Sequence, residues 1–414
     1  MSGFITGMKK LRILINIFFI LIILSIGGII VAVYINVDTK LDPEYSEAAT
    51  PDGSKYTMRE RFGVGGAVAT VNGVNNPLNM GWFFNWGVSD SSALIHTHNM
   101  AVDYMPVIGT WSNVGYPGDG TSKTCEQFKA DFAKNPYAYN SKTSVIIGNE
   151  IGWDVKLTPQ QYAVAFNAWK NCFRSFNPKI RVGSAAMLWE HGLAGGKVGE
   201  EYFKEFINIL RTNYGGDAGL PDFIVMHGYS ARDLNNPDYV IEIIKDIRKE
   251  MAALNLRNKD LVIKEFGPLS SPSQDFSNSY MDKTVNFFAS AKDPNTGNPE
   301  DSNRLVQRWA WFVSNESKTT LDNTPTWRNL ILFDQDNGFA ITPVGIKYKQ
   351  LIDKYVSPDS TCRIQGYKKV FGDQAQKSEF ENATITVTGN GQTQTCNSNP
   401  CIFNNLEGNK VYNI

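Results

Sequence analysis

The sequence is poor in cysteine and histidine and carries almost no net charge. Its 414 residues include 5 Cys and 4 His, and 40 Lys+Arg against 41 Asp+Glu give a formal net charge of -1. No cysteines have the Cys-x-x-Cys spacing of zinc or thioredoxin-type sites, which argues against both classes. A balanced charge also lacks the basic footprint of a nucleic-acid-binding protein, so we expect no nucleic-acid partner.

Motifs that bind nucleotides, phosphate or metals are missing as well. Gly63–Gly66 lacks the third glycine of a dinucleotide-binding turn, and neither a P-loop nor a G-x-S-x-G elbow occurs. His96 and His98 form an H-x-H pair without a recognisable third ligand, and Asp334–Gly338 has the wrong spacing for a calcium loop. The sequence therefore predicts neither a cofactor nor a metal site.

Apolar and aromatic side chains, by contrast, are abundant. Hydrophobic residues make up 42% of the chain and aromatic residues 12%, including 9 Trp. A chain of this length can bury a large core, and one large domain with a smaller one is the natural expectation. The aromatic residues suit either a core or a ligand surface with flat stacking faces, and composition does not separate the two.

One long apolar run lies near the N-terminus. Residues 13–35 carry no charge and are long enough to span a bilayer as a helix. A cleaved secretory signal is the alternative, but the run is long for one and lacks a small-residue cleavage site. Because Lys9, Lys10 and Arg12 precede the run, we expect residues from about 37 onward to lie outside the cytoplasm. Under either interpretation the rest of the chain is exported, to the cell surface or beyond.

Export would allow the cysteines to form disulfides. Cys396 and Cys401 flank a short N-S-N-P turn and could form a local bridge, and Cys125 could pair with Cys172. The odd count leaves at least one thiol free or intermolecular.

The remaining chain divides into a polar tether at 37–60, a large region at 61–356 and a smaller β-rich segment at 357–414, after the stub and anchor at 1–36. In the large region, buried strand patterns alternate with helical patterns, which favours a parallel sheet. The predicted strands are Phe62–Ala67, Met80–Asn85, Tyr104–Ile108, Ser144–Asn149, Arg181–Ala185, Phe223–His227, Leu261–Glu265 and Arg308–Val313. The predicted helices are Pro159–Phe176, Gly199–Asn213, Tyr239–Leu254 and Asn278–Ala291.

Eight such strands favour a closed (β/α)8 TIM barrel, an α/β fold, over an open doubly wound sheet. In the C-terminal segment, the Asn390-Gly391 pair between β-prone stretches predicts a hairpin.

Three predicted strands end in functional groups, at the end of a barrel where active sites form. One ends in Asn149 and Glu150, one in Glu265, and one in His227 followed by Tyr229. Two carboxylic acids across a barrel mouth suit glycoside hydrolysis, in which one protonates the leaving oxygen and the other attacks the sugar or activates water. The structural alternative is that the glutamates cap helices or pair with a cation such as Lys264 or an arginine.

Aromatic and amide side chains near the strand ends are candidates for sugar contacts. Asn85 and Trp86 end the second strand, Trp111 follows the third, and Trp311 lies on the eighth with Trp309 on the same side. Aromatic faces can stack on the apolar faces of sugar rings, although a single tryptophan is more often part of a core.

The ordered segments GWFFNWG, DYMPVIGTW, VIIGNE, RVGSAAM, DFIVMHGY, LVIKEFG, RWAWFV and ITPVGIKY resemble the glycosyl hydrolase catalytic domain of fungal cell-wall proteins, grouped with the family 128 β-1,3-glucanases. The resemblance implies a retaining TIM-barrel glycosidase with Glu150 as acid/base and Glu265 as nucleophile. It also implies that Asn149, His227, Tyr229 and Trp311 bind substrate. The family often has N-E-P where this chain has N-E-I-G-W.

The C-terminal segment resembles a shortened carboxypeptidase-regulatory-like or Cna-B-like β-sandwich module of surface proteins. The sequence thus predicts a membrane-anchored, retaining endo-β-glycosidase acting on an extracellular polysaccharide, first of all a β-1,3-glucan. One alternative is a membrane-anchored carbohydrate-binding or adhesion protein with little turnover. The other is a glycosidase of different linkage specificity.

Overall fold

The computed structural model describes residues 54–66, 77–86, 103–109, 124–127, 144–176, 178, 180–356, 361–366, 385–389, 392–396 and 401–407. Within these ranges, no helix has both the length and the apolar composition needed to cross a bilayer. The predicted anchor at 13–35 lies outside the described residues, as do His96, His98 and Trp111.

The predicted strands of the large region form one parallel sheet. Its order is β3-β2-β1-β11-β10-β9-β6-β5-β4. The strands are β1 (Phe62–Gly65), β2 (Trp82–Phe84), β3 (Asp103–Tyr104), β4 (Val107–Ile108), β5 (Ser144–Ile147), β6 (Arg181–Gly183), β9 (Phe223–His227), β10 (Asp260–Phe266) and β11 (Arg308–Trp311).

The two ends of this sheet belong to one chain segment. β3 pairs with β2, and β4 pairs with β5, while only Met105 and Pro106 separate β3 from β4. The Pro106 carbonyl accepts a hydrogen bond from the Ile146 amide at 3.0 Å, on the β5 side. Because residues 103–108 join both neighbours, the sheet closes on itself, as the barrel prediction requires and an open sheet would not.

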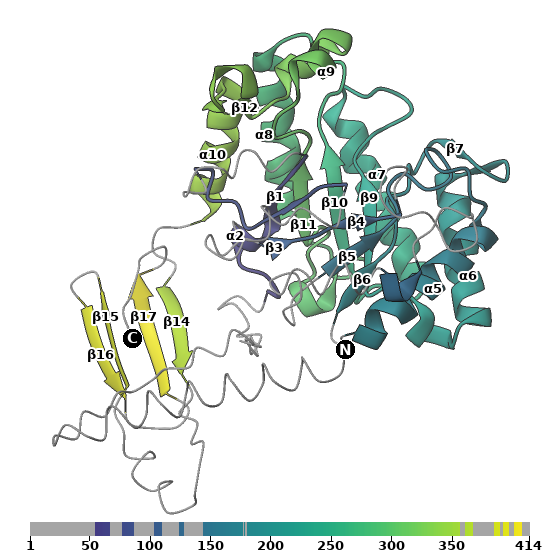
Figure 1. Ribbon diagram of the computed structural model, residues 1–414, viewed down its shortest axis with the longest axis horizontal. Helices are drawn as coiled ribbons and strands as arrows, with labels where there is room; N and C mark the ends of the chain where they lie inside the picture. Colours follow the sequence, from purple (N-terminus) through teal and green to yellow (C-terminus); the bar gives the residue numbers. More distant parts are fainter. Residues whose placement is uncertain are drawn as a thin grey trace, which may run out of the picture. The chain divides into compact units, whose positions relative to one another are not determined.

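Helices follow the strands from β5 onward and lie around the sheet (Figure 1). They are α5 (Pro159–Phe176), α6 (Gly199–Asn213), α7 (Pro237–Ala253), α8 (Gln274–Ser290) and α10 (Pro343–Tyr355). The first of them starts at its predicted residue, and Thr158 caps it, because the Thr158 hydroxyl accepts from the Gln161 amide while Gln161 Oε1 accepts from the Thr158 amide. The other elements of this region are α2 (Met58–Arg61), β7 (Gly192–Leu193), β8 (Lys197–Val198), η3 (Gly216–Gly219), η4 (Pro299–Asp301), α9 (Lys318–Asn323), η5 (Pro325–Asn329), β12 (Phe333–Asp334), η6 (Gln335–Asn337) and β13 (Ala340–Ile341).

Side chains on the barrel strands alternate between two apolar layers. One layer fills the inside of the barrel and includes Trp82, Phe84, Phe223 and Val262. The other lies between strands and helices, and it is much larger. Close packing inside leaves no room for a side chain at Gly63, where a Cβ would lie 2.3 Å from the Trp82 ring. The barrel is therefore a filled core, and a ligand can be bound only at its mouth.

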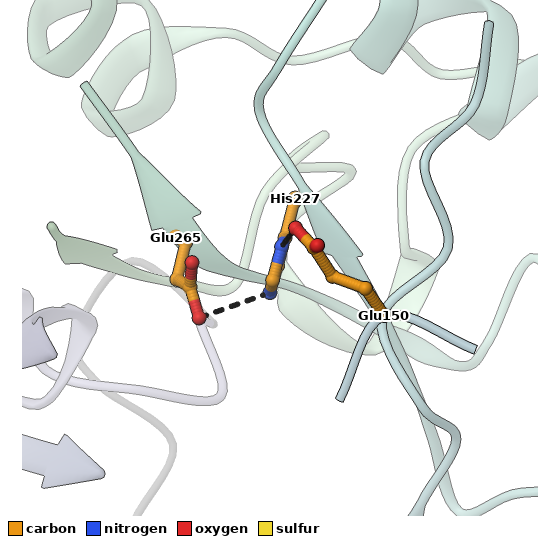
Figure 2. Close-up of side chains that lie close together, drawn as sticks. All are labelled: Glu150, His227 and Glu265. Carbon is orange, nitrogen blue, oxygen red and sulfur yellow. Dashed lines mark hydrogen bonds and ion pairs between the residues drawn. The ribbon is translucent and has the colours of Figure 1, made fainter. Parts of the chain in front are cut away.

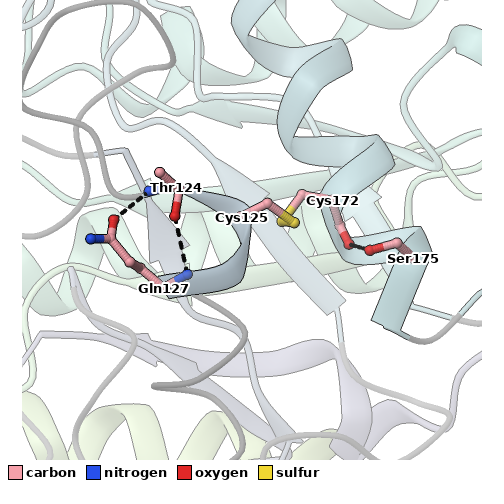
Figure 3. Close-up of a disulfide and its surroundings, with 5 residues drawn as sticks. All are labelled: Thr124, Cys125, Gln127, Cys172 and Ser175. Carbon is pink, nitrogen blue, oxygen red and sulfur yellow. Dashed lines mark hydrogen bonds between the residues drawn. A yellow bond between two sulfur atoms is a disulfide. The ribbon is translucent and has the colours of Figure 1, made fainter.

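A disulfide joins Cys125 to Cys172, which are 47 positions apart in sequence (Figure 3). Cys172 lies on α5, and Cys125 lies in a helical turn that begins with reciprocal hydrogen bonds between Thr124 and Gln127. The possible pairing of these two cysteines is thereby confirmed. The predicted Cys396–Cys401 bridge stays a prediction, because neither of these side chains is described.

The C-terminal segment contains two antiparallel strand pairs. β15 (Ile385–Gly389) pairs with β16 (Gln392–Cys396), with Gly389 opposite Gln392, so two residues remain for the turn. This confirms the predicted hairpin. β14 (Thr361–Gly366) pairs with β17 (Cys401–Glu407), a long-range pairing that the sequence did not predict.

Candidate active site

Two glutamates and a histidine meet at the carboxyl ends of three barrel strands. Glu150 follows β5, His227 ends β9, and Glu265 lies near the end of β10. His227 Nδ1 is 2.8 Å from Glu150 Oε1, and its Nε2 is 3.3 Å from Glu265 Oε1. Figure 2 shows the imidazole between the two carboxylates. One carboxylate oxygen of each glutamate lies within 4.8 Å of the other.

An irregularity in β10 positions the second glutamate. The pairing register of β10 shifts after Ile263 against both β9 and β11. Without this bulge, Lys264 and Glu265 would lie on opposite faces of the strand. With it, both side chains reach groups of the barrel mouth, while Phe266 packs on the helix side, 5.2 Å from the Trp311 ring.

Lys264 is the cation of the site and is fully buried. Its Nζ lies 3.0 Å from Glu265 Oε1 and donates a hydrogen bond to Asn149 Oδ1. The same Nζ lies 4.7 Å from the centre of the Phe84 ring, a cation–π arrangement. Lys264 thus brings a buried positive charge into contact with Glu265 and Asn149.

The Asn149 amide is held in one orientation. Its Oδ1 accepts from Trp86 Nε1 at 3.2 Å as well as from Lys264, and its Nδ2 donates to Asp154 Oδ2 at 2.9 Å. One N–H of the amide thus remains for a ligand. Trp86, only partly buried, packs edge-on against the Phe84 ring at 5.5 Å. These contacts link the ends of β2, β5 and β10.

The two carboxylates have different surroundings. Burial raises the pKa of Glu150, and the charges of Lys264 and His191 offset only part of this rise. Glu265 has a different set of contacts, since it accepts a hydrogen bond from Tyr229 Oη at 3.3 Å in addition to the nearby Lys264 cation. A carboxyl whose pKa is raised by burial therefore lies beside a carboxyl with a cation and a hydroxyl in contact, and such unlike surroundings suit the two roles of glycoside hydrolysis.

Glu150, His227 and Glu265 could also be considered as metal ligands, since one atom of each lies within 4.8 Å of the others. The imidazole, however, directs one nitrogen at each carboxylate. A single cation could bind only one of these nitrogens, so the ring would have to leave its place between the glutamates. The arrangement suits proton exchange better than metal coordination.

Of the other predicted sugar contacts, Asn85 lies beside the site, whereas Trp311 lies in the core. Asn85 is partly buried beside Trp86 and accepts a hydrogen bond from the Tyr104 hydroxyl. Trp311, in contrast, is fully buried on the helix side, and its Nε1 donates to the Leu330 carbonyl at 2.8 Å. Trp309 and Trp311 do share one face, as predicted, but that face belongs to the core. We therefore correct Trp311 to a packing residue.

Two site residues, Asp154 and His191, were not considered from the sequence. Lys264 was named as a possible ion-pair partner of the glutamates, and its contact with Glu265 confirms that pairing. No sequence signal reveals the β10 bulge that brings Lys264 beside Glu265. Asp154 and His191 reach the site through loops after β5 and β6, whose paths depend on tertiary contacts.

Comparison with known proteins agrees with this geometry. Residues 64–348 match the family described as glycosyl hydrolase catalytic core. Among solved structures, a GH128 subgroup II endo-β-1,3-glucanase from Sorangium cellulosum is 15% identical over 70% of this chain and 98% of its own, with a TM-score of 0.51. A curdlan-specific GH128 exo-β-1,3-glucanase from Blastomyces gilchristii is 18% identical over 71% and 99%, with a TM-score of 0.46.

No curated protein matches the chain. At these identities the solved structures show a shared fold, whereas the family match covers well over half of the sequence and includes Asn149, Glu150, His227 and Glu265. The resemblance seen in the strand-end segments is thereby confirmed. The chain belongs to the glycosyl hydrolase catalytic core family and is a glycoside hydrolase.

Proposed function

We propose that this glycoside hydrolase is a retaining, endo-acting β-glycosidase whose substrate is an extracellular polysaccharide, in the first place a β-1,3-glucan. The observation that carries the mechanism is the separation of the two carboxylates. Retaining enzymes have carboxyl groups about 5–5.5 Å apart, and inverting enzymes about 6.5–9.5 Å, to leave room for water. The Glu150 and Glu265 oxygens within 4.8 Å of each other support retention.

In the proposed first step, Glu265 attacks the anomeric carbon while the proton of Glu150 passes to the departing glycosidic oxygen. The product is a covalent glycosyl-enzyme and a free leaving sugar. In the second step, Glu150 removes a proton from water, and the water oxygen displaces Glu265 with net retention. Asn149, Trp86, Tyr229 and Asn85 are the proposed substrate contacts at the barrel mouth. Trp111, which lies outside the described residues, stays a proposed contact on the sequence alone.

The β-1,3-glucan proposal is supported by the shared fold of the Sorangium cellulosum endo-β-1,3-glucanase. The Cys125–Cys172 disulfide supports the proposed location outside the cytoplasm, because such bonds persist in oxidising compartments. Attachment through residues 13–35 is part of the same proposal.

The decisive experiment is hydrolysis of a panel of β-linked glucans, xylans and mannans, with the anomer of the first product followed by NMR. We expect β-1,3-glucan to be cleaved internally and the β-anomer to appear first. Glu265→Gln and Glu150→Gln should each reduce kcat at least about 10³-fold, because each removes one half of the acid–nucleophile pair.

Glu316→Gln is the matched control. Glu316 is a partly buried glutamate beyond the last barrel strand whose pKa burial also raises, but it hydrogen-bonds Thr320 instead of the pair. This variant should keep its activity. A first product of α configuration would exclude the retaining mechanism. Cleavage of another glucan alone would overturn the β-1,3-glucan proposal. Binding of a glucan without turnover would favour the carbohydrate-binding or adhesion alternative.

A further inference from the structure

Trp153 is an exposed aromatic side chain three residues after the proposed acid/base. Its side chain is 43% exposed, whereas Trp82, Trp169, Trp309 and Trp311 are almost completely buried. Lys156 Nζ lies over the Trp153 ring, 5.1 Å from its centre, but a cation can cover only one of the two ring faces. Exposing the rest of a large aromatic surface to water costs free energy, so the position of Trp153 near a catalytic group calls for an explanation. It lies in the N-E-I-G-W segment, where the chain departs from the N-E-P pattern of the family it resembles.

The backbone fixes Trp153 relative to Glu150. The amides of Trp153 and Asp154 both donate to the Glu150 carbonyl, at 3.1 and 2.8 Å. Gly152, which lies between Glu150 and Trp153 in sequence, adopts φ +80°, and its amide donates to the Val155 carbonyl at 2.8 Å. A Cβ at Gly152 would lie 2.9 Å from Leu193 Cβ, so the turn also packs closely against the β7–β8 hairpin. Trp153 is therefore presented by a tight, well-bonded turn.

The Trp153 side chain belongs to the acid side of the site. Its ring lies edge-on to the His191 imidazole, with 5.3 Å between ring centres, and His191 is close enough to Glu150 for their charges to interact. His227 contacts both carboxylates, whereas Lys264 and Tyr229 contact Glu265 directly. Trp153 and His191 therefore lie on the Glu150 side of the pair.

In a retaining glycosidase, the acid lies beside the leaving oxygen, so the leaving sugar lies on the side of the acid. From this geometry we propose that Trp153 is the stacking platform for the sugar ring on the leaving-group side of the scissile bond. The inference rests on the proposed function and extends it, because it identifies a residue that determines how the reducing-end part of the chain is bound. An aromatic platform there favours a polysaccharide substrate over a substrate with a small leaving group.

The test compares Trp153→Ala and Trp153→Phe on two substrates. One is a β-1,3-linked gluco-oligosaccharide that occupies both sides of the cleavage point. The other is the β-fluoride of a shorter oligosaccharide, which occupies only the nucleophile side because fluoride has no ring to stack. We expect Trp153→Ala to lower the ratio of kcat/KM for the oligosaccharide to kcat/KM for the fluoride about tenfold. Trp153→Phe should restore most of that ratio.

Ile346→Ala is the matched control, since Ile346 is equally exposed, at 46%, on α10. It should leave the ratio unchanged. An equal loss on both substrates in Trp153→Ala would indicate a general disturbance of the site and would overturn the inference, as would no loss on either. If the unaltered enzyme turned over neither substrate, the proposed function itself would fail, and the platform would fail with it.

Discussion

His227 lies between the two carboxylates as a neutral ring. Burial lowers its pKa to about 3, so the ring is neutral at pH 7. A neutral imidazole has one N–H and one acceptor nitrogen. Its Nδ1 is 2.8 Å from Glu150 Oε1, and its Nε2 is 3.3 Å from Glu265 Oε1. The ring can therefore accept a hydrogen bond from one carboxyl while it donates one to the other, which suits a pair of carboxyls with the two proposed roles.

Lys264 acts electrostatically on both carboxylates, so its removal should change the pKa of Glu150 in a definite direction. The Lys264 charge lowers the pKa of Glu150, so Lys264→Met should raise that pKa further. The alkaline limb of kcat/KM, where Glu150 loses its proton, should move to higher pH. The maximal rate should fall about 10²-fold, because Glu265 loses its stabilising cation.

A pH profile of the purified variant, with the exposed Lys283→Met as control, checks this prediction. The control should reproduce the profile of the unaltered enzyme. An alkaline limb that stays in place or moves to lower pH would show that Lys264 does not act on Glu150.

The sequence predicted that Glu150, Glu265 and His227 lie together, because such polar groups interrupt runs that are otherwise buried on both faces. Their catalytic roles stay a proposal. Trp311 was misplaced, since a strand apolar on both faces gives no sign of which face is inside the barrel. Lys264 was named as a possible ion-pair partner, and it does contact Glu265. The one-residue bulge that brings the two side chains to the barrel mouth could not be predicted from alternation.

At the scale of elements, all eight predicted strands were found, because each is a short apolar run between turn signals. α5 and α6 begin and end at the predicted residues, Pro159 to Phe176 and Gly199 to Asn213. Closure of the barrel could be expected from the number of strands. How the barrel closes could not be predicted from the sequence. Residues 103–108 pair with β2 through β3 and with β5 through β4.

The Cys125–Cys172 bridge ties a turn between β4 and β5 to helix α5, and its removal should destabilise the enzyme. Joining residues 47 positions apart lowers the entropy of the unfolded chain, and the bridge accordingly contributes about 4 kcal/mol to the free energy of unfolding. The double variant Cys125→Ser/Cys172→Ser should therefore unfold at a clearly lower temperature in calorimetry.

Cys362→Ser is the control, because it changes a cysteine outside this bridge. Its unfolding temperature should remain close to that of the unaltered enzyme. Labelling of Cys125 by a thiol reagent in the untreated native protein would show that the bridge is not formed.

For the molecule as a whole, the N-terminal part of the barrel domain is held by buried charges at the end opposite the active site. Asp260 is 1% exposed and accepts from Tyr56 Oη at 2.7 Å, with Arg181 and Lys55 as ion-pair partners. Arg61 forms a two-bonded pair with Asp301, at 2.6 and 2.8 Å, and both side chains are fully buried. These pairs connect residues 54–61 to strands β6 and β10 and to the short helix η4, all far along the sequence.

Asp260→Asn should therefore lower the free energy of unfolding by about 3–5 kcal/mol at pH 7, because it leaves buried cations without a partner. Arg181 and Lys55 hold the pKa of Asp260 well below its usual value, and this outweighs the effect of burial. The stabilisation is present above the unfolded pKa, about 3.9, and is lost as the pH falls toward the folded pKa.

Denaturant unfolding at several pH values measures this dependence. The difference between Asp260→Asn and the unaltered enzyme should be largest near neutrality and should shrink below about pH 4. Asp353→Asn, which changes an exposed pair with Lys349, should have an effect of at most about 1 kcal/mol. A difference between the two proteins that is independent of pH would contradict the assignment.

The buried charge pairs of Asp260 and Asp301 also limit how far the N-terminus of the domain can be shortened. The family match begins at residue 64. Three partners of the buried carboxylates precede it, since Lys55 pairs with Asp260, the Tyr56 hydroxyl donates to Asp260, and Arg61 pairs with Asp301. A recombinant fragment trimmed to the matched boundary would bury two carboxylates short of their partners and would start inside the first barrel strand. Expression designs for this domain should begin no later than residue 54.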